Sequence, residues 1–156
     1  WMIHSSISYG YKGPLVVFEK DWLTKLGYKT KTINGDVYRT YICPKIKAFA
    51  WDIWQTLWYQ PILVEDNALI HAAKATRLAW EQNGMILMEW PANSPDLNPI
   101  ENAWSLLKGR IQRQFPTPEE VRRYVEEEWE KLELEDFEKY TGNIRERCLA
   151  VINADG

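Results

Sequence analysis

Two acidic residues occupy positions where a protein can use a carboxylate for chemistry. Asp66 directly follows the apolar run 62–64, which predicts a short buried strand. The carboxyl end of such a strand is where α/β sheets place their ligands. Glu101 follows Asn98 and Pro99, which predict the cap and the first residue of a helix. Both positions are therefore candidates for a functional carboxylate.

Each candidate also has an ordinary structural interpretation. Asp66 and Asn67 together are typical of a turn that ends a strand. Glu101 stands three residues after Asn98, where it could complete a capping box by bonding back to the amide of the cap residue. His71 is compatible with a metal neighbour, a DNA contact or a satisfied residue at a helix start. Taken singly, these residues do not choose between structure and function.

Two sequence blocks carry a family resemblance. Residues 65–71 (Glu-Asp-Asn-Ala-Leu-Ile-His) and residues 90–104 (Trp-Pro-Ala-Asn-Ser-Pro-Asp-Leu-Asn-Pro-Ile-Glu-Asn-Ala-Trp) resemble the best-marked blocks of mariner-type DDE transposases. The 34 residues between Asp66 and Glu101 match an interval typical of that family. The hairpin 7–14 and the basic helix 106–111 are also similar to it. The resemblance covers about residues 1–20 and 60–115.

This resemblance implies a ribonuclease-H-like core in which three carboxylates gather two Mg²⁺ ions, with Mn²⁺ able to substitute. Such ions prefer oxygen ligands, and a pair of them suits phosphodiester cleavage. By the same resemblance, Asp66 and Glu101 are the second and third catalytic carboxylates and direct metal ligands. The remaining candidates are neighbours of the metal site or DNA contacts (His71, Asn102) and phosphate contacts (Lys108, Arg110, Arg113).

The sequence departs from the family pattern in two places. Leu69 replaces a proline that usually shapes the turn after the catalytic strand. The first catalytic aspartate is expected on a strand that precedes residue 1, and that strand lies at the centre of the family's sheet. We therefore expect this chain to be inactive alone. We also expect its sheet to show a gap, direct pairing across the gap, or completion by a second chain.

The patterning predicts an α/β domain with a mixed sheet, flanked by helices and extended by carboxyl-terminal helices. The resemblance implies that this ribonuclease-H-like sheet lacks its first, central strand. We expect a truncated catalytic core over residues 1–115 and packed helices over residues 116–156. The first predicted elements are a hairpin (2–9 and 15–18) and a connecting loop (21–35). A helix holding Ile46 to Leu57 follows, and Pro44 either begins it or divides it from a shorter helix. The remaining elements are strands (62–64 and 85–88) and helices over 71–83, from Pro99, from a Thr117 cap, and around 137–148.

Composition limits the function classes. The 156 residues are 46% hydrophobic and 26% charged, with nine tryptophans, which is globular composition. The net charge of −3 argues against tight autonomous DNA binding. Cys43 and Cys148 form no zinc pattern and indicate a reducing compartment. We therefore expect a nuclear or otherwise intracellular protein that is not secreted and has neither a membrane nor a small-molecule partner.

The leading hypothesis is a catalytic-domain fragment of a DDE transposase, with DNA as its partner and a homo-oligomer as its expected assembly. The alternative is an inert transposase remnant or a domesticated module that binds DNA or protein. A weaker alternative is a host ribonuclease-H-like nuclease.

Overall fold

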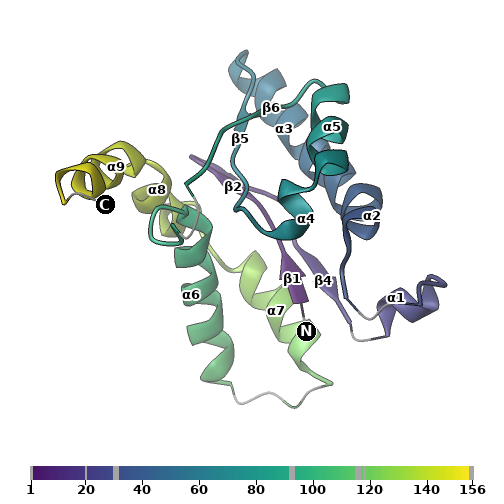
Figure 1. The fold of residues 1–156 in the computed structure, drawn as a ribbon. Coiled ribbons are helices and arrows are strands. Elements are labelled where there is room, and N and C mark those ends of the chain that lie inside the picture. Colours follow the sequence, from purple (N-terminus) through teal and green to yellow (C-terminus); the bar gives the residue numbers. More distant parts are fainter. Residues whose placement is uncertain are drawn as a thin grey trace. The chain divides into compact units, whose positions relative to one another are not determined.

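The computed structural model describes residues 2–19, 21–29, 32–91, 94–114, 117 and 119–154. Its chain divides into two compact units. The first unit comprises Trp1–His4 and Phe18–Asn93, and the second comprises Ser5–Val17 and Ser94–Gly156. The expected boundary between residues 115 and 116 stays a prediction. Figure 1 shows the order of the elements along the chain.

The predicted amino-terminal hairpin is present in two short pieces. Residues 11 and 12, which the prediction placed in the turn between the two strands, form a strand themselves. Strand β2 (Ile7–Ser8) pairs antiparallel with β3 (Tyr11–Lys12), so that Ile7 faces Lys12 and Ser8 faces Tyr11. The two-residue turn between them holds Gly10 at φ +71°, a left-handed backbone that glycine adopts without strain. Beyond the turn, β1 (Met2–His4) pairs with β4 (Val16–Phe18).

Helices follow the hairpin in the first unit. Helix α1 (Trp22–Lys25) corrects the prediction that residues 21–35 form a connecting loop. It is a single helical turn whose buried residue is Leu23. Asn34 caps α2 (Gly35–Val37) by accepting from the amides of Asp36 and Val37. A π-helical turn, η1 (Tyr38–Ile42), then leads into α3 (Cys43–Leu57). Pro44 lies in the first turn of α3, directly after η1.

The core of the first unit forms along one face of α3. Its buried residues Ile46, Ala50 and Ile53 recur at helical spacing, as the sequence predicts. Leu57 continues the same spacing but is 40% exposed at the end of the helix. Helix α3 ends at Trp58, which adopts a left-handed φ of 57° and is exposed.

A two-stranded parallel sheet completes the first unit. Strand β5 (Ile62–Leu63) pairs with β6 (Ile86–Leu87), with Ile62 beside Ile86. In Figure 1 the two strands lie side by side. The prediction that β5 is buried is wrong, because Ile62 is 54% exposed and Val64 is 36% exposed. One face of this small sheet is therefore open to solvent.

The helix predicted over residues 71–83 is two helices in the structure. Helix α4 (Leu69–Ala72) and helix α5 (Lys74–Gln82) meet at Ala73, whose extended ψ of 131° interrupts the helix. The buried Thr76 hydroxyl donates to the carbonyl of Ile70 at 2.7 Å. This bond links the start of α5 to α4 across the break. No residue type in the sequence indicates a break at this position.

The second unit is built from helices α6 (Pro99–Gln112), α7 (Val121–Glu130), α8 (Glu135–Thr141) and α9 (Ile144–Asn153). Two predictions need correction. Thr117 does not cap α7, which begins later; its amide and hydroxyl donate to the Glu120 carboxylate instead. The last predicted helix is divided at Gly142, where a Cβ would lie 2.9 Å from the carbonyl oxygen of Glu138.

Aromatic residues fill the core of the second unit. Trp129 on α7 is 1% exposed and packs between Trp104 on α6 and Phe137 on α8. Figure 1 shows α6 and α7 side by side. The Lys12 ammonium donates to the carbonyls of Trp129, Glu130 and Leu132 at 3.0, 2.9 and 3.2 Å. Lys12 thereby satisfies the carbonyls at the end of α7, where a positive charge also suits the helix dipole.

The strands form three two-stranded sheets, one parallel (β5–β6) and one antiparallel (β2–β3), alongside the β1–β4 pair. Within the described ranges, no strand pairing joins β1 or β4 to β5, so direct pairing across the expected gap is not observed there. None of the helices in the described part of the chain combines the length and apolar character needed to cross a membrane.

Candidate active site

Asp66 lies just beyond the end of β5, as predicted. Its Oδ1 accepts from the backbone amide of Ala68 at 3.0 Å, so the turn interpretation of this residue is also correct. The same oxygen accepts from Nδ1 of His71 at 2.6 Å. The side chain is 58% exposed. Both contacts use Oδ1, and this leaves Oδ2 as the oxygen that a cation can bind.

His71 is held close to this carboxylate by its place on α4. Its side chain is only 15% exposed, and its ring packs against that of Tyr38 with 4.7 Å between centroids. Because Nδ1 donates to Asp66, Nε2 is the ring nitrogen that remains for another contact. That nitrogen is buried and has no hydrogen-bond partner among the described residues. The structure thus brings Asp66 and His71 together.

Glu65, which precedes Asp66, is the centre of a buried polar network that sequence reasoning did not identify. Its Oε1 accepts from the hydroxyl of Tyr38, and its Oε2 accepts from Nε1 of Trp80 at 3.1 Å. Tyr38 and Trp80 are almost completely buried. The only signal in the sequence is a charged residue at the end of the apolar run 62–64. Its partners are 27 and 15 residues away along the chain, so no local pattern indicates them.

Burial changes the acid–base properties of this network. Desolvation raises the pKa of the Glu65 carboxyl, although the hydrogen bonds from Tyr38 and Trp80 oppose that shift. Burial also raises the pKa of the Tyr38 hydroxyl, and the neighbouring Glu65 charge adds to the effect. The pKa of the Cys43 thiol rises to about 12, again chiefly through burial. Tyr38 and Cys43 therefore keep their protons at neutral pH and act as hydrogen-bonding and packing groups.

His4 makes the first unit sensitive to acid. Burial, with a smaller contribution from His71, lowers the pKa of His4 to about 4 from 6.5, while Asp66 opposes the shift. The unfolded chain therefore binds more protons between these two values, and stability falls as pH drops from about 6.5 to about 4. We expect a loss on the order of 2 kcal/mol in unfolding free energy between pH 7 and pH 4.5.

Urea unfolding at the two pH values measures this loss. In the variant His4→Phe, which keeps an aromatic ring against Tyr38 but cannot be protonated, the difference between pH 7 and pH 4.5 is expected to shrink by that amount. Equal pH dependence in the two proteins would contradict the assignment.

Glu101 lies in the first turn of α6, in the second unit. Asn98 caps this helix, since its side chain accepts from the amide of Ile100 at 3.3 Å. The amide of Asn98 donates to the carbonyl of Pro95 at 3.1 Å and not to the Glu101 carboxylate. The reciprocal half of the capping box is therefore absent. The exposed Glu101 carboxylate is left available for another role.

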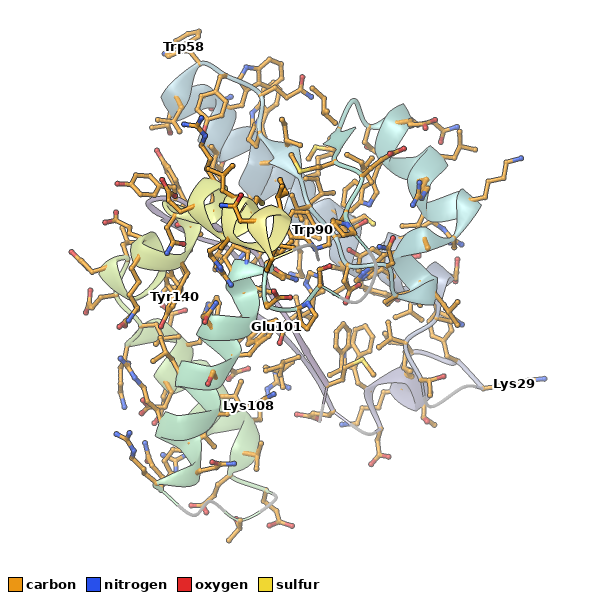
Figure 2. All side chains as sticks on the ribbon, turned by 60° about the vertical axis from the view of Figure 1, so that its left-hand side comes forward. Lys29, Trp58, Trp90, Glu101, Lys108 and Tyr140 are labelled. Atoms are coloured by element: carbon orange, nitrogen blue, oxygen red, sulfur yellow. The ribbon has the colours of Figure 1, made fainter. Side chains whose placement is uncertain are left out.

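The other predicted residues lie along the same helix. Figure 2 shows Glu101 and Lys108 on α6, with Lys108 farther from the start of the helix. Asn102 is half-buried, whereas Lys108 and Arg113 are exposed. The Arg110 guanidinium is already engaged, because it donates to the carbonyl of Lys131 and to the carboxylate of Asp136, both at 3.2 Å. Lys108 and Arg113 are thus better placed than Arg110 to meet a phosphate.

Each unit presents carboxylate oxygens, which are the ligand atoms that hard divalent cations prefer. The first unit presents the exposed carboxylate of Asp66 and the second presents that of Glu101. Over the described residues, no group of three or more His, Cys, Asp or Glu side chains is placed to hold a metal ion. The roles of Asp66, Glu101 and the other site residues stay predictions.

Known proteins give this arrangement a family. A family model for the DDE superfamily endonuclease matches residues 24–122, more than half of the chain and a range that includes both Asp66 and Glu101. The chain is 30% identical over 95 residues to the Tc3 transposase of Caenorhabditis elegans, and 29% identical over 96 residues to the Tc1 transposase of the same organism. These alignments cover 59% and 61% of this chain but only 29% and 35% of the two transposases.

Solved structures support the same fold. The catalytic domain of the Mos1 mariner transposase is similar with a TM-score of 0.68 and 23% sequence identity, over 80% of this chain and 63% of that domain. The Mos1 catalytic domain with raltegravir and Mn gives a TM-score of 0.70, over 80% of this chain and 64% of that one. The fold is thus the α/β ribonuclease-H-like fold expected from the sequence. The chain belongs to the DDE superfamily endonuclease family.

Proposed function

We propose that this chain supplies the catalytic core of a DDE transposase, which cuts DNA at transposon ends and joins the freed 3′ hydroxyl to target DNA. The observation that carries the proposal is the family match over residues 24–122, which spans both acidic blocks. Because the chain spans only about a third of the Tc3 and Tc1 transposases, the activity of a complete protein is part of the proposal.

The proposed cofactor is Mg²⁺, with Mn²⁺ as a substitute. The Mos1 catalytic domain has been solved with Mg and with Mn, which supports this choice. When bound, a pair of such ions would activate the attacking oxygen and stabilise the departing one. Asp66 would hold the metal through Oδ2, because His71 and the amide of Ala68 occupy Oδ1. Glu101 would contribute the second carboxylate from the first turn of α6.

DNA is the proposed partner, in transposon ends and target. The Mos1 mariner transposase has been solved as a paired end complex, which supports DNA as the partner. Self-association of this chain is a further part of the proposal. Lys108 and Arg113 would neutralise backbone phosphates from the exposed surface of α6, whereas Arg110 would hold α6 to the loop before α8. A DNA substrate places the proposed site of action in the nucleus or elsewhere inside the cell.

A cleavage assay tests the proposal. The complete protein that contains this chain is incubated with supercoiled plasmid and with DNA carrying its own flanking ends, with Mg²⁺, with Mn²⁺ or with chelator. We expect metal-dependent strand breaks that leave a 3′ hydroxyl at the flanking ends. Absence of cleavage under both metals, from a folded protein that still binds DNA, would favour the inert or domesticated alternative. Selective cutting of an RNA–DNA hybrid would favour the host nuclease.

A further inference from the structure

The backbone that carries Asp66 is anchored by the preceding residue. Glu65 receives one hydrogen bond on each carboxylate oxygen, from Tyr38 and from Trp80. The two donors are 1% and 0% exposed, so this anchor lies in the interior of the first unit. Hydrogen bonds in such surroundings are electrostatically stronger than the same bonds in water. The position of residue 65 is therefore more restrained than the two-residue strand β5 alone would make it.

Tyr38 also contacts His71, the histidine that bonds to the Asp66 carboxylate. Its ring packs against His71 at 4.7 Å between centroids, and His71 donates to Asp66 Oδ1 at 2.6 Å. His4 packs against the same tyrosine at 5.7 Å. One buried side chain thus supports both the residue before Asp66 and the histidine that holds it.

The place of Tyr38 in the helix is a separate observation. Tyr38 is the first residue of the π-helical turn η1, which lies between α2 and α3. Short π-helical segments are rare in proteins, and those that occur are often found at functional sites. The residue that begins this π-helical turn is the one that contacts both Glu65 and His71.

We propose that Tyr38 and Glu65 are positioning residues for the Asp66 carboxylate, acting through the backbone at residue 65 and through the His71 ring. This inference rests on the proposed function, because it assigns Asp66 a role that demands a fixed orientation. An exposed carboxylate samples several rotamers, and a metal ligand works best when its neighbours hold one of them. Tyr38 and Glu65 do not touch the metal or the DNA in this scheme.

The first test is nuclear magnetic resonance on the 156-residue chain. The short bond between His71 Nδ1 and Asp66 Oδ1 should give a protected, downfield imidazole proton. We expect Tyr38→Phe, which removes a single oxygen atom, to speed solvent exchange of that proton by up to about tenfold, the size expected from the loss of one hydrogen bond. Tyr41→Phe is the matched control, since Tyr41 lies in the same π turn but packs against Trp22.

Glu65 provides the second pair of variants. Glu65→Gln keeps the shape of the side chain and can still bond to Tyr38 and Trp80, so it should retain most of the protection. Glu65→Ala should speed exchange of the His71 proton at least as much as Tyr38→Phe does. If Tyr38→Phe and Glu65→Ala lower the melting temperature but leave the His71 proton as protected as in Tyr41→Phe, the network is structural only and the inference is overturned.

A second measurement separates this inference from the proposed function. In the complete protein, Tyr38→Phe should raise the Mg²⁺ concentration for half-maximal cleavage by about tenfold, with a smaller change at saturating Mg²⁺. If the unaltered protein does not cleave DNA, the proposed function fails, while the resonance experiment still decides whether Tyr38 and Glu65 hold Asp66. An unchanged Mg²⁺ requirement in an active Tyr38→Phe protein would overturn the inference alone.

Discussion

Replacing Asp66 by Asn is expected to lower Mg²⁺-dependent DNA cleavage by about 10³-fold or more, which corresponds to roughly 4 kcal/mol of lost transition-state stabilisation. The asparagine side-chain oxygen can still accept from the Ala68 amide and from His71. The local turn is therefore retained while the negative charge is lost. Because the Asp66 side chain is 58% exposed, we expect its removal to change the unfolding free energy by less than about 0.5 kcal/mol.

Glu101→Gln is expected to cause a loss of similar size for the same reason. Its carboxylate is exposed and is not used by the helix cap, so the substitution leaves Asn98 and the start of α6 intact. The measurement is the rate of end cleavage at saturating Mg²⁺, with DNA binding recorded in parallel.

Asp52→Asn is the matched control for Asp66, because Asp52 is another exposed aspartate of the first unit, on α3. Its cleavage rate should equal that of the unaltered protein. A folded Asp66→Asn protein that keeps more than about a tenth of the activity would remove Asp66 from the catalytic set.

Trp129→Ala is expected to have the largest effect on stability, lowering the unfolding free energy of the second unit by about 3–5 kcal/mol. Trp129 is 1% exposed and packs against Trp104 and Phe137, so truncation leaves a cavity among three elements. A small unit with a total stability of the usual 5–15 kcal/mol would lose a large part of it. Urea unfolding followed by far-ultraviolet circular dichroism measures the change without relying on tryptophan fluorescence.

Trp58→Ala is the control for that experiment. Trp58 is 88% exposed at the end of α3, where Figure 2 shows it projecting from the ribbon. Removing it should change stability by less than about 0.5 kcal/mol. If the Trp129 and Trp58 variants were equally stable, the aromatic core described for the second unit would be wrong.

The sequence was a good guide where neighbours along the chain decide the structure. Alternating residues and the Gly10 turn predicted the hairpin, helical spacing predicted α3, and Asn98-Pro99 predicted the start of α6. It was a poor guide where contacts between elements interrupt a favourable pattern. At the break at Ala73, Thr76 bonds to the carbonyl of Ile70, and at the break at Gly142 an added Cβ would lie 3.1 Å from the Tyr9 ring.

The candidate site divides in the same way. The family, the two acidic blocks and the closeness of His71 to Asp66 could be read along the chain, because they depend on residue identity and on separations of a few positions. The anchor of Glu65 by Tyr38 and Trp80 and the engagement of Arg110 by Asp136 came only from the folded chain. Their partners are distant in sequence, and such pairs are made when whole elements pack together rather than by local propensity.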